Sequence, residues 1–170
     1  MQFKNCHRLI WLIITGLACQ VVCGQRPASA WPAAGQVDSL RVLVWKKKVS
    51  ANQLSELSNF VELRQLTLQN ARLTAFPEEI CNLKNLEYLS LGNNEIDSVP
   101  ACICELNQLK TLELWENNIY NLPPCMERMK NLKVLDLRTM KYSVQEHSDL
   151  MLRFKHLDIK LSEPCDCNFD

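Results

Sequence analysis

Apolar residues recur every 23 positions along most of the chain. The best-aligned leucine columns hold Leu63, Leu86, Leu109 and Leu132; Leu66, Leu89, Leu112 and Leu135; and Leu68, Leu91, Leu114 and Leu137. Each unit opens with Leu-x-x-Leu-x-Leu, whose alternation predicts a short strand, and continues through a turn into a return segment broken by proline. No unit can bury its own leucines, so stacked units sharing one core, a solenoid, are expected.

The repeats extend beyond the best-aligned units. Leu40, Leu43 and Trp45 occupy matching places one period earlier, and Phe154, Leu157 and Ile159 indicate a last strand that is offset by one residue. We therefore predict a repeat domain over residues 37–161 with about five to six coils. Its fold class is an α/β solenoid: a short arc with a parallel β-sheet on the concave side and irregular or short helical segments on the convex side.

The pattern L-x-x-L-x-L-x-x-N-x-L, present at 86–96 and 109–119, resembles the leucine-rich repeat family. The Val99-Pro100 and Leu122-Pro123 pairs that follow it are similar to the 23-residue class of bacterial and plant proteins. The resemblance implies that Asn94 and Asn117 are buried and satisfy backbone groups between coils. The same column holds Ala71 and Met140 in other units, so those coils are expected to be less regular and to use water or a shifted loop.

Side chains between the leucines should project from the concave face of the sheet. At the centre we expect Trp115 to point outward, with Gly92 leaving room on one side and Arg138 close enough to stack on the indole. Tyr88, Glu113, Glu116 and Asp136 surround this tryptophan. The last strand is expected to place Asp158 beside Asp136 and Lys160 beside Arg138.

Aromatic side chains and arginine amid carboxylates are typical of a protein-binding hot spot. The candidate partner-binding residues are therefore Tyr88, Gly92, Glu113, Trp115, Glu116, Asp136 and Arg138. Trp115 would anchor a protein ligand, while Glu113 and Asp136 would select a basic one. The alternative is that the indole lies flat over the sheet and covers neighbouring strands.

Residues 1–24 have the layout of a secretory signal peptide: Lys4 and Arg8, an apolar run, and small residues near Gly24. An uncleaved membrane anchor is the alternative, but Leu9 to Val22 is shorter than the roughly 20 residues that a bilayer span needs. Leu17-Ala18-Cys19 also partly resembles the box before a lipid-modified bacterial cysteine. A Pro/Ala-rich linker, 25–36, precedes the repeats, and export to the cell envelope or extracellular space is expected.

Nine cysteines are present, and six lie beyond the predicted signal peptide: Cys81, Cys102, Cys104, Cys125, Cys165 and Cys167. The period places Cys81 over Cys104 and Cys102 over Cys125, and neighbouring coils are close enough for disulfides. Alternatively, these cysteines fill the turn as small apolar residues. The C-terminal tail, 162–170, holds the remaining pair. The spacings do not favour a metal site, since zinc motifs prefer two to four intervening residues.

Charge and composition narrow the function. Lysine plus arginine and aspartate plus glutamate both count 19, and the predicted sheet columns are mixed to acidic, which disfavours nucleic acid. Four glycines form no glycine-rich loop, and no nucleophile with a base is indicated, so neither an enzyme nor a cofactor is predicted. We expect a non-catalytic protein-binding module with its ligand on the concave face. The alternative is a structural envelope lipoprotein that contacts the membrane through an N-terminal lipid anchor.

Overall fold

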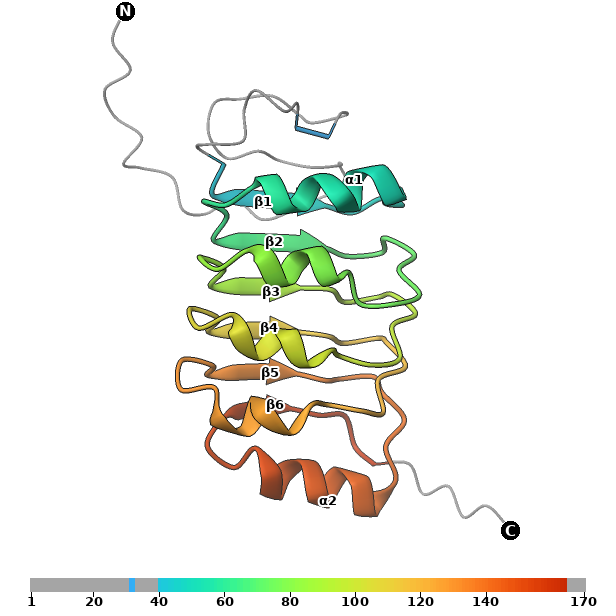
Figure 1. Ribbon diagram of the computed structural model, residues 1–170. Helices are drawn as coiled ribbons and strands as arrows, with labels where there is room; N and C mark the ends of the chain where they lie inside the picture. Colours follow the sequence, from blue (N-terminus) through green and yellow to red (C-terminus); the bar gives the residue numbers. More distant parts are fainter. Residues whose placement is uncertain (1–30, 33–39, 165–170) are drawn as a thin grey trace, which may run out of the picture.

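The computed structural model describes residues 31–32 and 40–164. Its six strands form one parallel sheet in chain order: β1 Val42–Trp45, β2 Gln65–Leu68, β3 Tyr88–Ser90, β4 Thr111–Glu113, β5 Val134–Asp136 and β6 Asp158–Lys160. Figure 1 shows the coils stacked with β1 at one end and β6 at the other. The predicted α/β solenoid with its parallel sheet is confirmed.

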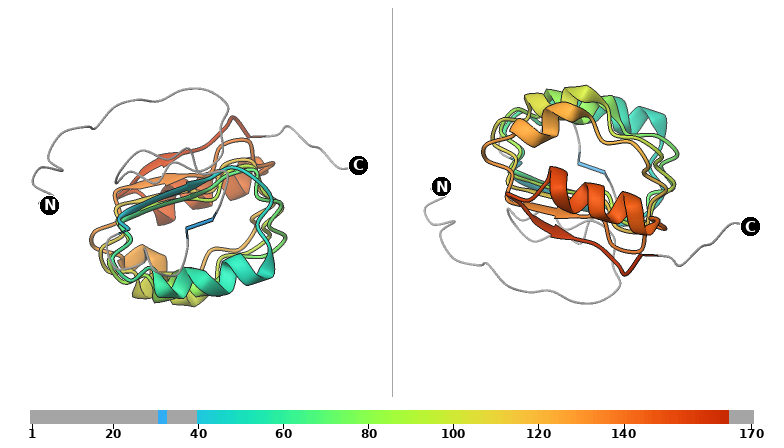
Figure 2. Two further views of the ribbon diagram at one scale, coloured as in Figure 1. Left: turned by 90° about the horizontal axis from the view of Figure 1, so that it is seen from above. Right: turned by 90° about the horizontal axis from the view of Figure 1, so that it is seen from below.

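Short helices form the other side of the stack (Figure 2). They are α1 Ala51–Glu56 and the 3₁₀ helices η2 Leu57–Asn59, η3 Glu78–Asn82, η4 Ala101–Glu105 and η5 Pro124–Arg128, whereas α2 Val144–Arg153 lies apart from them, at the C-terminal end of the stack. Pro77, Pro100 and Pro123 stand immediately before η3, η4 and η5, where their fixed φ suits the chain entry into a helix. Capping boxes at Ser50 and Ser143 start α1 and α2. None of the helices that the structure describes is long and apolar enough to cross a membrane.

The leucine columns form one continuous core between sheet and helices. Leu66, Leu89, Leu112 and Leu135 are fully buried, as are the neighbouring columns. At the first coil, Trp31 packs edge-on against Trp45 with ring centroids 5.2 Å apart. The core is therefore covered at its N-terminal end by an aromatic side chain from outside the repeats.

Coils one to five are related by the 23-residue period, but the last is not. Val134 pairs with Asp158 and Asp136 with Lys160, so β6 lies 24 residues after β5. The predicted last strand is confirmed, but its predicted register was wrong: Lys160, not Asp158, lies beside Asp136. The return segment of this coil holds the ten-residue helix α2 in place of a five-residue 3₁₀ helix, which changes the length of the return path.

Asn94 and Asn117 are buried and bond across the coils, as the resemblance implied. The Asn94 side-chain oxygen accepts from the backbone N–H groups of Ala71 and Leu73 at 2.9 and 3.1 Å, and its amide donates to the carbonyls of Leu68 and Leu91. Asn117 makes three of these four hydrogen bonds one coil later: it accepts from Ile96 N–H and donates to the carbonyls of Leu91 and Leu114. The Ala71 coil therefore needs no water for these groups, because the following coil supplies the asparagine.

The turns after the strands share one backbone conformation. Asn70, Asn93, Glu116 and Thr139 occupy one column and have φ between 53° and 63°. The Ala71 turn adds a second left-handed residue, Arg72, with φ 57°. The expected irregularity of that coil is thus a change of loop shape. In the Met140 coil, a different cross-coil hydrogen bond is present: the Tyr142 hydroxyl donates to the Ile119 carbonyl.

The remaining predictions fall on residues outside the described part of the chain. They are the signal peptide 1–24, the lipid-modified Cys19, most of the linker 25–36, and Cys165 and Cys167.

Candidate binding surface

The sheet face carries a connected set of polar side chains at its centre. Tyr88 on β3 donates from its hydroxyl to Glu113 Oε2 on β4 at 2.7 Å. Burial, and then the adjacent Glu113 carboxylate, raise the pKa of Tyr88 well above its ordinary value. The phenol therefore stays protonated and holds Glu113 in one orientation. Glu113 lies beside Asp136 in the register of β4 and β5.

Asp136 is already paired within the protein. Arg138 Nε donates to Asp136 Oδ1 at 2.9 Å and Arg138 Nη2 donates to Oδ2 at 2.6 Å. The carboxylate is 1% exposed, whereas the Arg138 side chain is 55% exposed. Asp136 in turn raises the pKa of Arg138. Direct selection of a basic partner by Asp136 was the wrong expectation, because burial and Arg138 occupy its carboxylate; its role is to fix Arg138.

Trp115 is half-buried and lies over the preceding coil. A Cβ added to Gly92 would stand 2.2 Å from Trp115 Cε2, so the indole occupies the space that glycine leaves. Gly92 itself is buried and cannot touch a ligand through a side chain. The indole therefore packs over the neighbouring coil, as the alternative expectation stated, while part of the ring remains accessible to solvent.

Arg138 does not stack on Trp115. Its guanidinium is held by Asp136, and in the described part of the chain the cation–π contact is that of Arg153 with Phe154, at 5.2 Å. The expected stacking was wrong because the carboxylate is the stronger partner for a guanidinium. Glu116, also predicted for the site, is exposed in the left-handed turn after β4. It borders the surface and is not buried in it.

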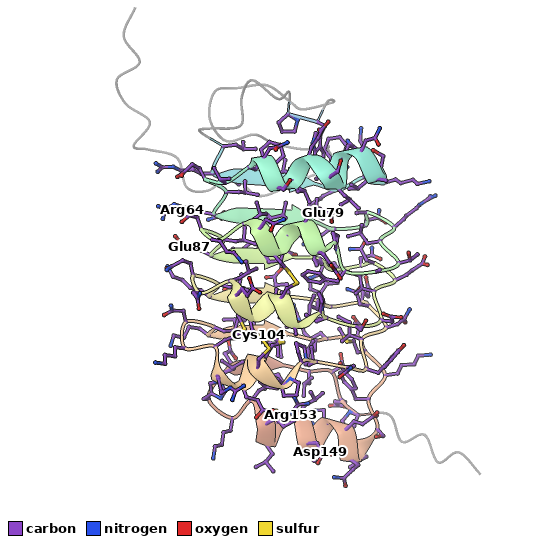
Figure 3. All side chains as sticks on the ribbon, in the orientation of Figure 1. Arg64, Glu79, Glu87, Cys104, Asp149 and Arg153 are labelled. Atoms are coloured by element: carbon purple, nitrogen blue, oxygen red, sulfur yellow. A yellow bond between two sulfur atoms is a disulfide. The ribbon has the colours of Figure 1, made fainter. Side chains whose placement is uncertain are left out.

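Charged residues before the strands form a row that the sequence reasoning missed. The row holds Arg41, Arg64, Glu87, Lys110 and Lys133. Glu87 Oε1 and Oε2 accept from Arg64 at 2.7 Å and from Lys110 at 2.6 Å (Figure 3 labels Arg64 and Glu87). Lys110, then Arg64, lower the pKa of Glu87. The 23-residue spacing of these charges was the available signal.

Tyr120 is a second feature that the sequence reasoning missed. Its side chain is 74% exposed, the largest exposure among the large apolar residues described, and it lies beyond β4 in the same coil as Trp115. One period earlier stands Asp97, whose Oδ2 is 3.4 Å from the tyrosine hydroxyl. Tyr120 lies on the return path of the coil, outside the alternating residues between the leucines that indicate the sheet face.

Two disulfides join the helices on the opposite side of the molecule. Cys81 pairs with Cys102 and Cys104 with Cys125, with Cα atoms 5.7 and 6.0 Å apart. Bridges between neighbouring coils are confirmed, but the pairs implied by the period were wrong. Cys102 and Cys104 are two residues apart on a 3₁₀ helix and so point to opposite sides, one toward the preceding coil and one toward the following coil.

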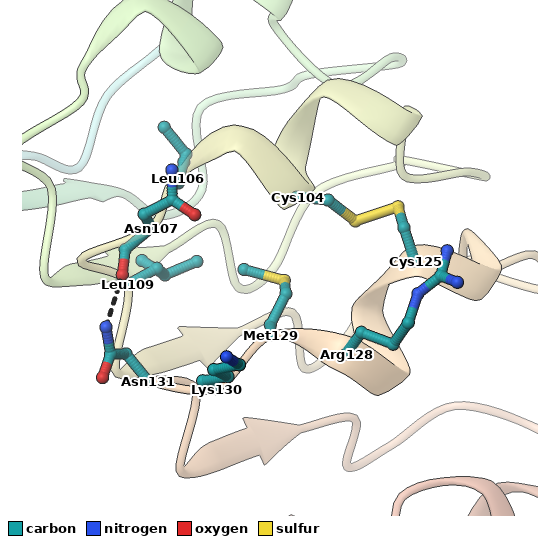
Figure 4. A pocket seen from close by; sticks show the side chains of 9 residues that line it. All are labelled: Cys104, Leu106, Asn107, Leu109, Cys125, Arg128, Met129, Lys130 and Asn131. Carbon is teal, nitrogen blue, oxygen red and sulfur yellow. Dashed lines mark hydrogen bonds between the residues drawn. A yellow bond between two sulfur atoms is a disulfide. The ribbon is translucent and has the colours of Figure 1, made fainter.

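A hollow lies on the helical side, between η4 and η5 (Figure 4). It encloses about 410 Å³ beside the Cys104–Cys125 bridge, with Met129 at its base. Asn131 crosses its rim and donates to the Asn107 carbonyl at 2.7 Å. The lining offers no acid–base or nucleophilic pair, and the described residues contain no group of His, Cys, Asp or Glu that could hold a metal ion.

Solved structures with the same architecture include proteins from Leptospira interrogans, Listeria monocytogenes and Arabidopsis. The leucine-rich-repeat protein LIC12759 of Leptospira interrogans is 33% identical, with a TM-score of 0.66, over 74% of this chain and 32% of that one. An internalin (inlF) from Listeria monocytogenes is 15% identical, with a TM-score of 0.56, over 76% of this chain and 45% of that one. This chain therefore spans about a third to under half of their lengths.

A plant receptor shows the same fold with a bound ligand. The ectodomain of the Arabidopsis receptor kinase HAESA, in complex with an N-terminally extended IDA peptide hormone, is 18% identical, with a TM-score of 0.52. The match covers 63% of this chain and 23% of that one. No curated protein matches the sequence. A family described as a leucine-rich repeat region matches residues 21–168, and the chain therefore belongs to the leucine-rich repeat family.

Proposed function

We propose that this chain is a non-catalytic binding module of the cell envelope or extracellular space, and that its protein ligand lies on the concave sheet face. The observation that carries the proposal is the preformed centre of that face. Trp115 is fixed on Gly92, Tyr88 on Glu113 and Arg138 on Asp136. Side chains that are ordered before binding lose less entropy on contact, which favours affinity.

The chemistry of this centre favours a mixed ligand. The accessible part of the Trp115 indole would accept an apolar or flat side chain. Glu113 and the exposed Glu116 would meet a basic group, and the exposed Arg138 head an acidic group or a backbone carbonyl. A peptide or loop of a protein, with a basic residue next to an apolar one, satisfies all three.

Two observations support an extracytoplasmic location. Disulfides form and persist chiefly in oxidising compartments, and two are present in consecutive coils. An internalin and a receptor ectodomain are among the structures with this fold. We infer that residues 1–24 act as the export signal and that the repeats belong to the 23-residue class. Attachment through Cys19 would add a membrane anchor, which radiolabelled fatty acid incorporation into the protein detects.

Capture of a ligand from envelope and extracellular fractions tests the proposal. The purified chain, the Trp115→Ala variant and the Tyr120→Ala variant are immobilised in parallel, and bound proteins are identified by mass spectrometry. Wild type and Tyr120→Ala should retain the same protein, and Trp115→Ala about tenfold less, the loss typical of a central aromatic anchor. Circular dichroism establishes that the variants are folded.

Two results would overturn the proposal. Equal capture by wild type and Trp115→Ala would remove the centre of the sheet face from the site. Loss of capture only in Tyr120→Ala would move the ligand to the return side of the coil. Glu113→Gln keeps an acceptor for Tyr88 and removes the charge, so it tests the basic group separately.

A further inference from the structure

The last coil exposes a strand edge and several apolar side chains at the C-terminal end of the stack. β6 pairs with β5 on one edge, and no strand among the described residues pairs with its other edge. Beside it lies α2, in which only Leu150 is buried and Val144, Met151 and Leu152 are 55%, 46% and 71% exposed. Figure 1 shows α2 and β6 together at this end of the stack.

The direction in which α2 exposes its apolar residues follows from Arg153. Arg153 Nε donates to Glu127 on η5 at 2.9 Å, so this side of α2 faces the preceding coil. A helix turns about 100° per residue, which places Val144 opposite Arg153 and Met151 close to that opposite side. Both apolar side chains therefore face the open end of the stack, the direction in which β6 also presents its free edge.

We propose that this end binds the same end of a second copy of the chain, with β6 pairing antiparallel to β6 of that copy about a two-fold axis through Ile159. Asp158 N–H donates to the Lys133 carbonyl and the Lys160 carbonyl accepts from Leu137 N–H, so these residues use their backbone groups toward β5. Backbone groups alternate in direction along a strand, so Ile159 directs its N–H and carbonyl to the free edge.

In this pairing, the backbone groups on the free edge of β6 form hydrogen bonds with the same groups of the second copy. Ile159 N–H and carbonyl bond to the carbonyl and N–H of Ile159 in the second copy. Leu161 N–H donates to the carbonyl of Leu157 in the second copy. Leu157 N–H takes no part in the pairing, because it already donates to the Phe154 carbonyl of its own chain. The two-fold axis makes each of these contacts twice, and the assembly closes as a dimer because each edge meets its own counterpart.

The side chains are self-complementary in this register only. Asp158 comes opposite Lys160 of the second copy, and Lys160 opposite Asp158, at non-hydrogen-bonded positions where facing side chains are closest. Both side chains are exposed on the sheet face. Charged residues on an edge strand commonly prevent association. Here the opposite charges permit one antiparallel register, while a slip of two residues would place like charges together.

Sedimentation equilibrium of the purified protein over about 1 to 100 µM tests the proposal. Wild type should show a concentration-dependent monomer–dimer equilibrium. Asp158→Lys places two lysines opposite one another in each pair and should raise the dimer dissociation constant about tenfold or more. The double variant Asp158→Lys/Lys160→Asp restores opposite charges and should return the constant to within about threefold of wild type.

The charge-swapped double variant is the matched control for folding and for net charge. Recovery of the dimer in this variant supports the register, because its composition at these two positions is the same as that of wild type. A monomer at every concentration would overturn the proposal, as would a dimer that Asp158→Lys leaves unchanged or that the double variant fails to restore. The proposal is independent of what the sheet face binds.

Discussion

At Gly92 the absence of a side chain decides where Trp115 lies. The position of a Cβ at residue 92 overlaps the indole, with three ring atoms within 2.6 Å. Trp115 and Gly92 therefore form one packing unit, although they belong to different coils. Replacing either changes the other's surroundings.

The first prediction concerns this pair. Gly92→Ala should lower the free energy of unfolding by about 1–3 kcal/mol, because the indole must leave its position over β3. In a Trp115→Ala background the same change should cost much less, giving a coupling energy of about 1 kcal/mol or more in a double-mutant cycle. Urea denaturation of the four proteins measures it, and additive effects would contradict the packing described.

Asn94 is the residue on which the central coils depend for backbone hydrogen bonds. Asn94→Ala leaves two N–H and two carbonyl groups without this partner in a buried turn, so we predict a loss of about 3 kcal/mol or more in the free energy of unfolding. Asn118→Ala, at an exposed amide in the next coil, should cost less than about 0.5 kcal/mol. Equal urea midpoints for the two variants would show that the hydrogen bonds of Asn94 between the coils do not stabilise the protein.

At the scale of elements, the two disulfides tie η3, η4 and η5 into one strip along the helical side. Each closes a loop between neighbouring coils, and removing one is expected to cost about 2–4 kcal/mol. Cys102 pairs with the preceding coil and Cys104 with the following coil, because the two side chains leave η4 in different directions. Chemical labelling can test this pairing without a structure.

The pairing prediction uses single variants. In Cys81→Ser the thiol left free should be Cys102, and in Cys125→Ser it should be Cys104. Alkylation without reductant, followed by reduction and a second alkylating reagent, locates the free thiol by tandem mass spectrometry. Wild type treated in the same way gives the background. Labelling of Cys104 in Cys81→Ser would instead support the pairing of cysteines one full period apart.

Glu87 joins three coils through ion pairs with Arg64 and Lys110, and its lowered pKa makes its contribution depend on pH. A carboxyl group whose pKa is lower in the folded protein stabilises it above the unfolded pKa, and this contribution is lost as pH falls through the folded pKa. Glu87→Gln should therefore be less stable than wild type at pH 7, by under about 1 kcal/mol because the side chain is partly exposed. The difference should shrink as the pH is lowered from 7 to an acidic value at which Glu87 is protonated in the folded protein. Urea midpoints at both pH values measure it; a difference that persisted in acid would contradict the ion-pair origin.

Strands and core could be predicted from sequence because the leucine spacing reports directly which side chains face inward. The alternation at Leu109, Leu112 and Leu114 leaves one arrangement of the strand. The disulfide pairing and the pairing of Asp136 with Arg138 were not predictable in this way, and the covering of a neighbouring coil by Trp115 was expected only as an alternative. They depend on side-chain directions on 3₁₀ helices and on competition between partners, which a period alone does not contain.

At the scale of the whole molecule, the proposed ligand site and the proposed dimer contact lie on different parts of the solenoid. The sheet face has its ordered centre at β3, β4 and β5, while the free edge of β6 and the apolar side of α2 lie at the C-terminal end. A two-fold axis perpendicular to the sheet would leave both sheet faces on the same side of a dimer. Ligand binding and dimer formation can therefore occur together, and each can be removed without the other.

Photo-crosslinking from opposite faces tests the central claim, that the sheet face is the ligand site. A photoreactive amino acid replaces Gln65, exposed on β2, or Glu78, exposed on η3, and each protein is irradiated with the captured ligand. The account predicts a crosslinked product from position 65 that is lost when Trp115→Ala is added, and none from position 78. Crosslinking from position 78 without crosslinking from position 65 would place the ligand on the helical side and contradict it.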